Sequence, residues 1–219
     1  MKKIFIKTKA SFIRGVTFIE LVVVISIFAL ISTVVLFNFS DFSTSLSLQN
    51  ISQDIALRIA QAQREAVSGK VSTLQGGFGA PIDYVPKYGV YFSSVSSASS
   101  DFNQPGKEFI YFQDLPGSGY IDGKYDADQT SGQLATTCST QSTECLDRTF
   151  ITTGDRVTSI TVDGAVVPEV TIMFKRPFPD AMIYTSAAGG NSQADIEITS
   201  PKGVTKHVLV NSLGQISVQ

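Results

Sequence analysis

The chain begins with a long apolar run. Residues 16–39, VTFIELVVVISIFALISTVVLFNF, contain Glu20 as their only charged residue. At about 1.5 Å per residue, a helix of these 24 residues spans the roughly 30 Å hydrocarbon core of a bilayer. A cleavable secretory signal has a shorter apolar stretch, of about 7–15 residues, closed by small residues. The pattern therefore predicts a single transmembrane helix over residues 16–39.

The apolar pattern changes over residues 40–69 but remains helical, because no proline interrupts it and no glycine precedes Gly69. We expect residues off its apolar stripe, such as Arg58, Arg64 and Glu65, to face solvent. Gly69 is expected to end the helix as a C-cap. The stripe predicts an amphipathic continuation of the helix that packs on a sheet. Its members recur at steps of three and four: Leu48, Ile51, Ile55, Ile59, Ala62 and Ala66.

Residues 70–219 have the pattern of strands and turns. Turn sequences at 200–203 and 211–214 separate the last three expected strands, which predicts an antiparallel meander. A long helix whose outer half lies on an antiparallel sheet is an α+β fold. We therefore expect a β-rich globular head over residues 70–219, with a loop insertion at 93–148. Segments rich in β-branched and aromatic residues predict strands at 88–92, 108–113, 170–176, 195–199, 206–210 and 215–218.

Charge is distributed unevenly along the chain. Residues 1–15 carry five basic residues and no acidic one, whereas the chain from Val16 onward has 12 basic and 19 acidic residues, a formal charge of −7. The positive-inside tendency places the N-terminus in the cytoplasm and the head on the far side of the membrane. A head of this sign is poorly suited to non-specific binding of nucleic acid, which needs clustered Lys and Arg.

Glu20 is the residue that a plain membrane anchor does not explain. A carboxylate within a spanning helix costs on the order of 3 kcal/mol by insertion scales, unless it finds a partner or lies near the interface. One interpretation places Glu20 one turn into the helix, at headgroup level and in water. The other gives it a function, which is the default for an ionisable residue in a membrane.

The residues around Glu20 resemble a known processing signal. A basic leader, Gly15 at the junction, Glu20 five residues on and an uninterrupted apolar helix together resemble the class III signal of type IV pilins and type II secretion pseudopilins. The resemblance implies a pilin-like fold and removal of the leader, residues 1–15, by a prepilin peptidase that cuts between Gly15 and Val16. It also implies N-methylation of Val16. Glu20 is then expected to meet the N-terminus of a neighbouring subunit, since a buried charge is tolerable when it is paired.

The sequence departs from the usual pattern of the family at two points, and two of its segments resemble one subgroup of the family. Val16 stands where the family usually has Phe or Met, and the helix lacks the internal proline common in major type IV pilins. Residues 53–71 and 207–218 resemble the H-type minor pseudopilins and related minor pilins. The resemblance implies an inner-membrane, single-pass subunit that later joins a pilus or pseudopilus filament. Its implied partners are other pilin or pseudopilin subunits, the prepilin peptidase, the inner-membrane assembly platform and membrane lipid.

Two other functions remain as alternatives. A membrane-anchored domain that never assembles would leave Glu20 without a purpose. A tip-located binding module for DNA uptake or adhesion would need a basic patch with aromatic residues. The nearest candidates for that patch are Lys175, Arg176, Lys202 and Lys206.

We expect no enzymatic activity. The sequence has no nucleophile elbow, phosphate-binding loop or zinc signature. His207 is the only histidine, and its strand context indicates a residue on a strand surface rather than a general base. No catalytic residue is therefore assigned.

Two smaller features suggest a disulfide and a calcium site. Cys138 and Cys145 flank a short polar loop on the side of the membrane where disulfides persist, which favours a disulfide over two unpaired thiols. Residues 120–128, YIDGKYDAD, offer carboxylate oxygens that calcium could use. Their spacing does not match an EF-hand, and an ordinary solvated turn is the preferred interpretation, so no cofactor is expected. The carboxylates concerned are Asp122, Asp126 and Asp128, with Asp114 upstream.

Overall fold

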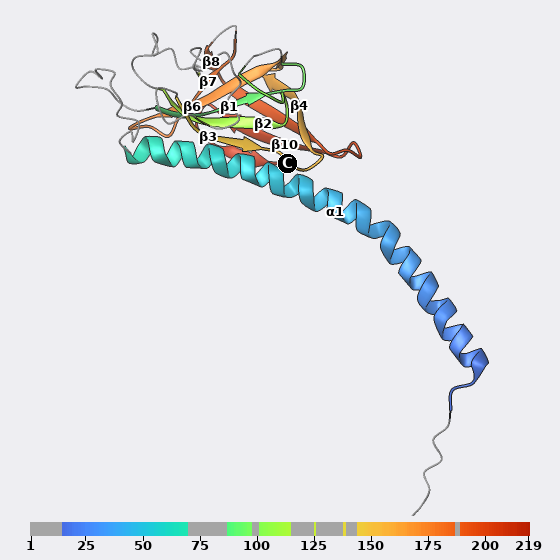
Figure 1. Ribbon diagram of the computed structural model, residues 1–219. Helices are drawn as coiled ribbons and strands as arrows, with labels where there is room; N and C mark the ends of the chain where they lie inside the picture. Colours follow the sequence, from blue (N-terminus) through green and yellow to red (C-terminus); the bar gives the residue numbers. More distant parts are fainter. Residues whose placement is uncertain are drawn as a thin grey trace, which may run out of the picture. The chain divides into compact units, whose positions relative to one another are not determined.

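The protein is described by a computed structural model (Figure 1). It describes residues 15–69, 87–97, 101–114, 125, 138, 144–186 and 189–219, apart from the side chains of residues 37, 38, 40 and 41. The chain divides into two compact units, residues 1–42 and 43–219. Each unit is described by itself below.

The helix α1 (Phe18–Ser68) begins in the first unit and ends in the second. Its stretch from Phe18 to Leu36 is long and apolar enough to span a membrane, and none of that stretch is buried. The helix ends at Gly69, which has a positive φ of 68°. The expected glycine C-cap is therefore confirmed, because this left-handed conformation suits glycine and closes a helix.

The described strands of the second unit form two antiparallel sheets. The first sheet has the order β3-β2-β1-β6-β7-β8, and the second has the order β11-β10-β9-β4-β5. The strands of the first sheet are β1 (Lys87–Ser93), β2 (Glu108–Asp114), β3 (Cys145–Phe150), β6 (Glu169–Lys175), β7 (Ala181–Tyr184) and β8 (Gly189–Asn191). Those of the second sheet are β4 (Arg156–Val162), β5 (Ala165–Val167), β9 (Gln193–Thr199), β10 (Thr205–Asn211) and β11 (Ile216–Val218).

The α+β class and each of the expected strands are confirmed, and β9, β10 and β11 form the expected meander. The expectation of one sheet is wrong, because the apolar pattern of a strand does not say which strand it pairs with. The prediction also missed β3, β4, β5, β7 and β8. Of these, β3 lies partly inside the predicted loop insertion at 93–148 and carries charged residues whose partners are remote in sequence.

The main core lies between α1 and the two sheets. The predicted stripe of α1, from Leu48 to Ala66, is buried at every one of its expected positions. Figure 1 shows the teal C-terminal half of α1 lying alongside the strands of the head. The same cluster takes residues from the inner faces of strands in both sheets: Tyr88, Val90, Phe92, Val170, Ile172, Phe174, Val157, Ile160, Ile196, Ile198, Val208 and Val210.

The outer face of the first sheet has a second, smaller core. Tyr91, Ile110 and Phe112 from β1 and β2 pack against Phe102 and Tyr125, which belong to the predicted insertion. Beneath the same cover, the guanidinium of Arg148 in β3 donates a hydrogen bond of 3.0 Å to the carboxylate of Glu108 in β2, and both side chains are almost fully buried. The described part of the insertion is therefore fixed to the sheet.

Two charged residues of α1 tie the helix to the first sheet. The guanidinium of Arg58 bonds the Asp147 carboxylate and lies 5.6 Å from the centre of the Tyr111 ring. The Tyr111 hydroxyl donates a hydrogen bond of 2.6 Å to Glu65 Oε2. The expectation that Arg58 and Glu65 face solvent is therefore wrong, because their partners come from β2 and β3. Arg64 is exposed, as expected.

The carboxylate of Glu65 also affects two tyrosines. Burial, together with the negative charge of Glu65, raises the pKa of Tyr88 to about 12. Burial and the hydrogen bond to Glu65 raise the pKa of the Tyr111 hydroxyl as well. Both hydroxyls therefore remain protonated well above the pH at which an exposed tyrosine ionises.

Replacing a buried residue of the stripe tests the importance of helix packing. Ile59 is 0% exposed and Leu57, two residues away on the same helix, is 67% exposed. We expect Ile59→Ala to lower the free energy of unfolding by about 2–5 kcal/mol, and Leu57→Ala to change it by less than about 0.5 kcal/mol. The measurement is denaturant unfolding of the full chain in micelles, followed by near-UV circular dichroism. Equal losses for the two variants would contradict the packing.

The tyrosine pKa values make stability depend on alkaline pH. Because the folded pKa of Tyr88 is about 12 and its ordinary value is 10.0, its contribution to stability is complete below pH 10 and is lost as the pH rises from 10 through 12. We expect Glu65→Gln to lower the pKa of Tyr88 and Tyr111. Tyr125 is the internal control, because burial and charges other than Glu65 raise its pKa to about 12. The measurement is an NMR titration of ¹³C-labelled tyrosine Cζ, in which equal shifts at all three residues would refute the assignment.

Candidate functional site

The predicted processing site lies immediately before α1. Gly15, Val16 and Thr17 are exposed and not helical, and the helix begins at Phe18. A Cβ atom placed on Gly15 would meet nothing within 4 Å. The Gly15–Val16 bond therefore lies in exposed, non-helical backbone, and exposed backbone of this kind is where peptide bonds are cleaved most readily.

Thr17 caps the helix that follows. Its Oγ1 accepts a hydrogen bond of 3.3 Å from the backbone N–H of Glu20, and its carbonyl oxygen accepts one of 3.1 Å from Leu21 N–H. Thr17 and Glu20 have the spacing of a Thr-x-x-Glu capping box, in which the threonine satisfies a free N–H group of the first turn. Thr17 is not among the predicted site residues, although its spacing to Glu20 before an apolar run could have identified it from the sequence.

The carboxylate of Glu20 is exposed in the first turn of α1 and has no hydrogen-bond or ion-pair partner in the described part of the chain. A carboxylate near a helix N-terminus gains about 0.3–1 kcal/mol from the helix dipole. The cost of placing it in hydrocarbon is on the order of 3 kcal/mol. The helix terminus therefore offsets only part of the cost, and Glu20 in a membrane needs water or a cation from outside this helix.

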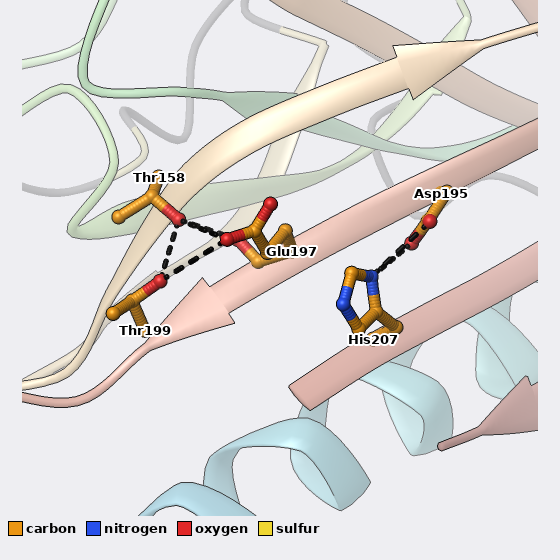
Figure 2. A network of polar contacts seen from close by, with 5 residues as sticks. All are labelled: Thr158, Asp195, Glu197, Thr199 and His207. Atoms are coloured by element: carbon orange, nitrogen blue, oxygen red, sulfur yellow. Dashed lines mark hydrogen bonds and ion pairs between the residues drawn. The ribbon is translucent and has the colours of Figure 1, made fainter. Parts of the chain in front are cut away.

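His207 lies on the exposed face of the second sheet, as expected. Figure 2 shows its ring pointing toward Asp195 on the neighbouring strand, with Nδ1 at 3.0 Å from Oδ1. On the same face, the hydroxyls of Thr158 and Thr199 lie 2.7 Å apart, and both are bonded to Glu197. Activation of a nucleophile requires a hydroxyl bonded to a base. Neither threonine hydroxyl is bonded to His207, so this group has no hydroxyl–histidine pair.

The basic residues considered for DNA binding are not gathered into one patch. Lys175 and Arg176 lie at the end of β6, and the backbone N–H of Ala181 after that turn donates 2.9 Å to Ser212 O at the far end of β10. Lys202 and Lys206 lie at the opposite end of β10. A strand of this length separates the two pairs by about 20 Å.

The predicted calcium ligands Asp122, Asp126 and Asp128 lie outside the described residues. Upstream of them, Asp114 is at the end of β2 and accepts a hydrogen bond of 2.8 Å from Lys87 Nζ. Among the side chains that the structure describes, no three His, Cys, Asp or Glu residues form a group that could hold a metal ion.

Cys138 and Cys145 form the expected disulfide, with their Cα atoms 5.2 Å apart. Cys145 is the first residue of β3 and belongs to the second core, against which Cys138 also packs. The disulfide therefore ties one point of the insertion to the sheet.

Models of known protein families, characterised proteins and solved structures were compared with the chain, and none matches it. Any function assigned to the chain therefore depends on its own residues, and above all on those at the start of α1.

Proposed function

We propose that the chain is a minor pilin or pseudopilin, a structural subunit of a type IV pilus or type II secretion filament. The observation that carries the proposal is the start of α1. An exposed Gly15–Val16 bond leads into an apolar helix whose first turn holds the carboxylate of Glu20, which has no partner among the residues that the structure describes. In this proposal the Gly15–Val16 bond is the site of processing, and Glu20 is the residue through which copies assemble.

The continuity of α1 supports a retained anchor over a cleaved secretory signal. A secretory signal is cut just after its apolar stretch. Here that position lies within a helix that continues without interruption to Ser68. The later residues of the same helix, such as Ile55 and Ile59, are fully buried in the core of the head. Cleavage ahead of the helix, at Gly15, leaves this element whole.

Cleavage at Gly15 creates the cation that Glu20 lacks. The new amino group at Val16 is positively charged, and each copy then has one terminal cation and one carboxylate in its first turn. Val16 lies outside the helix, because Thr17 is the capping residue, so it is not placed one helical turn from Glu20 within the same chain. Pairing Glu20 with the amino group of a neighbouring copy neutralises both charges in hydrocarbon.

The remaining features fit a structural role. The peptidase, other subunits, the inner-membrane assembly platform and lipid are the proposed partners, and the head is proposed to lie outside the cytoplasm. No catalytic step is proposed. In Figure 2 the hydroxyls of Thr158 and Thr199 are bonded to Glu197 and not to His207. Lys175 and Arg176 are separated from Lys202 and Lys206 by the length of β10, so the four basic residues named for the DNA-binding alternative do not form one patch.

Processing is tested by the intact mass of the chain from membranes of cells with and without a co-expressed prepilin peptidase. We expect a product that begins at Val16 and carries one added methyl group, only when the peptidase is present. The accessible, non-helical backbone at Gly15 is the physical reason. A chain that keeps residues 1–15, or is cut after the apolar segment, would refute the proposal.

The charge of Glu20 is tested by Glu20→Gln, which keeps the shape of the side chain. We expect cleavage and membrane insertion to persist while copy-to-copy association falls by about 100-fold, since removing one partner of a buried ion pair costs at least about 3 kcal/mol. Association is measured by cross-linking of tagged chains in membranes.

Ser26→Ala is the matched control for Glu20→Gln. The Ser26 hydroxyl lies in the same apolar segment but donates a hydrogen bond of 2.8 Å to Val22 O within its own helix. Its removal should leave association unchanged. Equal association of the Glu20→Gln and Ser26→Ala chains would show that the carboxylate has no part in assembly.

A further inference from the structure

Two turns that are remote in sequence meet on the last part of α1. The side-chain amide of Gln63 donates hydrogen bonds of 2.8 Å to Pro179 O, in the β6–β7 turn, and 3.0 Å to Gly214 O, in the β10–β11 turn. The backbone of Ala181 is also bonded to Ser212 O. One helix residue therefore holds both turns in a fixed position.

The contact between the turns is close enough to require glycine. Gly214 has a φ of 78°, and a Cβ atom there would lie 2.1 Å from Pro179 O. Arg176, in the first of these turns, reaches the end of α1, where its Nη1 lies 2.8 Å from the position of a Cβ on Gly69. The last turn of α1 has no basic residue of its own, so Arg176 supplies the positive charge that favours a helix C-terminus.

This junction exposes apolar side chains beside unpaired cations. Phe178, Leu213 and Val67 are 64%, 67% and 42% exposed. Arg64, Lys175 and Arg176 are exposed and have no acidic partner among the described residues. Single exposed apolar residues are ordinary, but several gathered by three segments mark an interaction site. We call this surface the turn patch: Arg64, Val67, Lys175, Arg176, Phe178 and Leu213.

A surface of opposite charge lies on the outer face of the second sheet. Thr161 in β4 is opposite Asp195 in β9 and opposite Val166 in β5, which is 73% exposed. Figure 2 shows Asp195 and Glu197 along β9. Asp195 is bonded to His207 on the same face, whereas Glu197 is bonded to threonine hydroxyls and has no cationic partner in the described residues. We call this surface the acidic sheet face: Thr161, Val166, Asp195 and Glu197.

We propose that the turn patch of one copy docks on the acidic sheet face of a second copy of this chain. The inference rests on the proposed function as a filament subunit. Opposite charges fix the register of such a contact, and each surface adds apolar side chains to it. The two surfaces are different parts of the head, so the contact is heterologous and can repeat along an open filament. Because Gln63 already holds both turns, docking orders little additional backbone.

The contact is tested by Phe178→p-benzoylphenylalanine in the full processed chain in membranes, with two tags to identify copy-to-copy products. We expect irradiation to give such products, with the partner peptide containing residues 161–167 or 193–199. The matched control is Val204→p-benzoylphenylalanine, an exposed apolar position at the other end of β10. We expect at least about tenfold less of this product from the control, since it lies about 20 Å from the turn patch.

Charge reversal in the chain that carries the Phe178→p-benzoylphenylalanine probe tests whether the contact depends on opposite charges. We expect Lys175→Glu combined with Arg176→Glu to lower the Phe178 product about tenfold, through like-charge repulsion with Asp195 and Glu197. Adding Asp195→Lys and Glu197→Lys to the same chain should restore it. Restoration cannot come from a misfolded head, so it separates loss of contact from loss of folding. Failure to restore the product in a chain with an unchanged near-UV spectrum would overturn the proposal.

A probe in the apolar helix, Leu30→p-benzoylphenylalanine, separates this inference from the proposed function. Copy-to-copy products from Leu30 without the expected product from Phe178 would overturn the docking and leave filament assembly in place. Absence of copy-to-copy products from both positions would overturn both. Phe178 adducts with lipid or nucleic acid in place of the second copy would also overturn the docking.

Discussion

The burial of one stripe of α1 against two sheets is the interaction on which the rest of the head depends. Burying a large aliphatic side chain contributes about 1.5–3 kcal/mol, so Leu48, Ile51, Ile55 and Ile59 together contribute an amount similar to the net stability of a whole domain. The inner faces of both sheets meet the same stripe. Without the helix, neither sheet would have a complete apolar cover.

Polar contacts then decide how the helix lies on the sheets, because apolar packing by itself has little directionality. Arg58 and Glu65 bond side chains of β3 and β2, and Gln63 bonds the backbone of two turns. These residues lie along the flanks of the buried stripe and fix its rotation and its position along the sheet. The same contacts place exposed residues of three segments beside one another, so the fixing of the helix also builds the turn patch.

At the beginning of the helix, by contrast, the polar groups that form hydrogen bonds do so within the helix or with its cap. Thr17 accepts hydrogen bonds from two backbone N–H groups of the first turn, and the hydroxyls of Ser26 and Thr33 donate to carbonyl oxygens of their own helix. Glu20 is the exception, since the helix terminus offsets only part of its cost in hydrocarbon. In the proposed assembly, the charge of Glu20 gives the association of copies a position along the helix, which uniform apolar packing would not provide.

Much of the architecture was determined by local pattern. The apolar segment, the stripe from Leu48 to Ala66, the end of the helix at Gly69 and the meander of the last strands could be predicted because each depends on residues close together in the chain. The Thr17 cap is equally local and could have been found from its spacing to Glu20. The short separation of Cys138 and Cys145 likewise made their disulfide predictable.

Only the tertiary structure decided the two-sheet arrangement, the partners of Arg58 and Glu65, and the meeting of two turns at Gln63. These features join residues that the chain separates widely, by 46 positions for Glu65 and Tyr111 and by 151 for Gln63 and Gly214. A charged or amide side chain on a helix has the same local pattern whether it faces water or a remote strand. Its environment is set by which strands pair and where their turns fall, and hydrophobic periodicity carries no information about either.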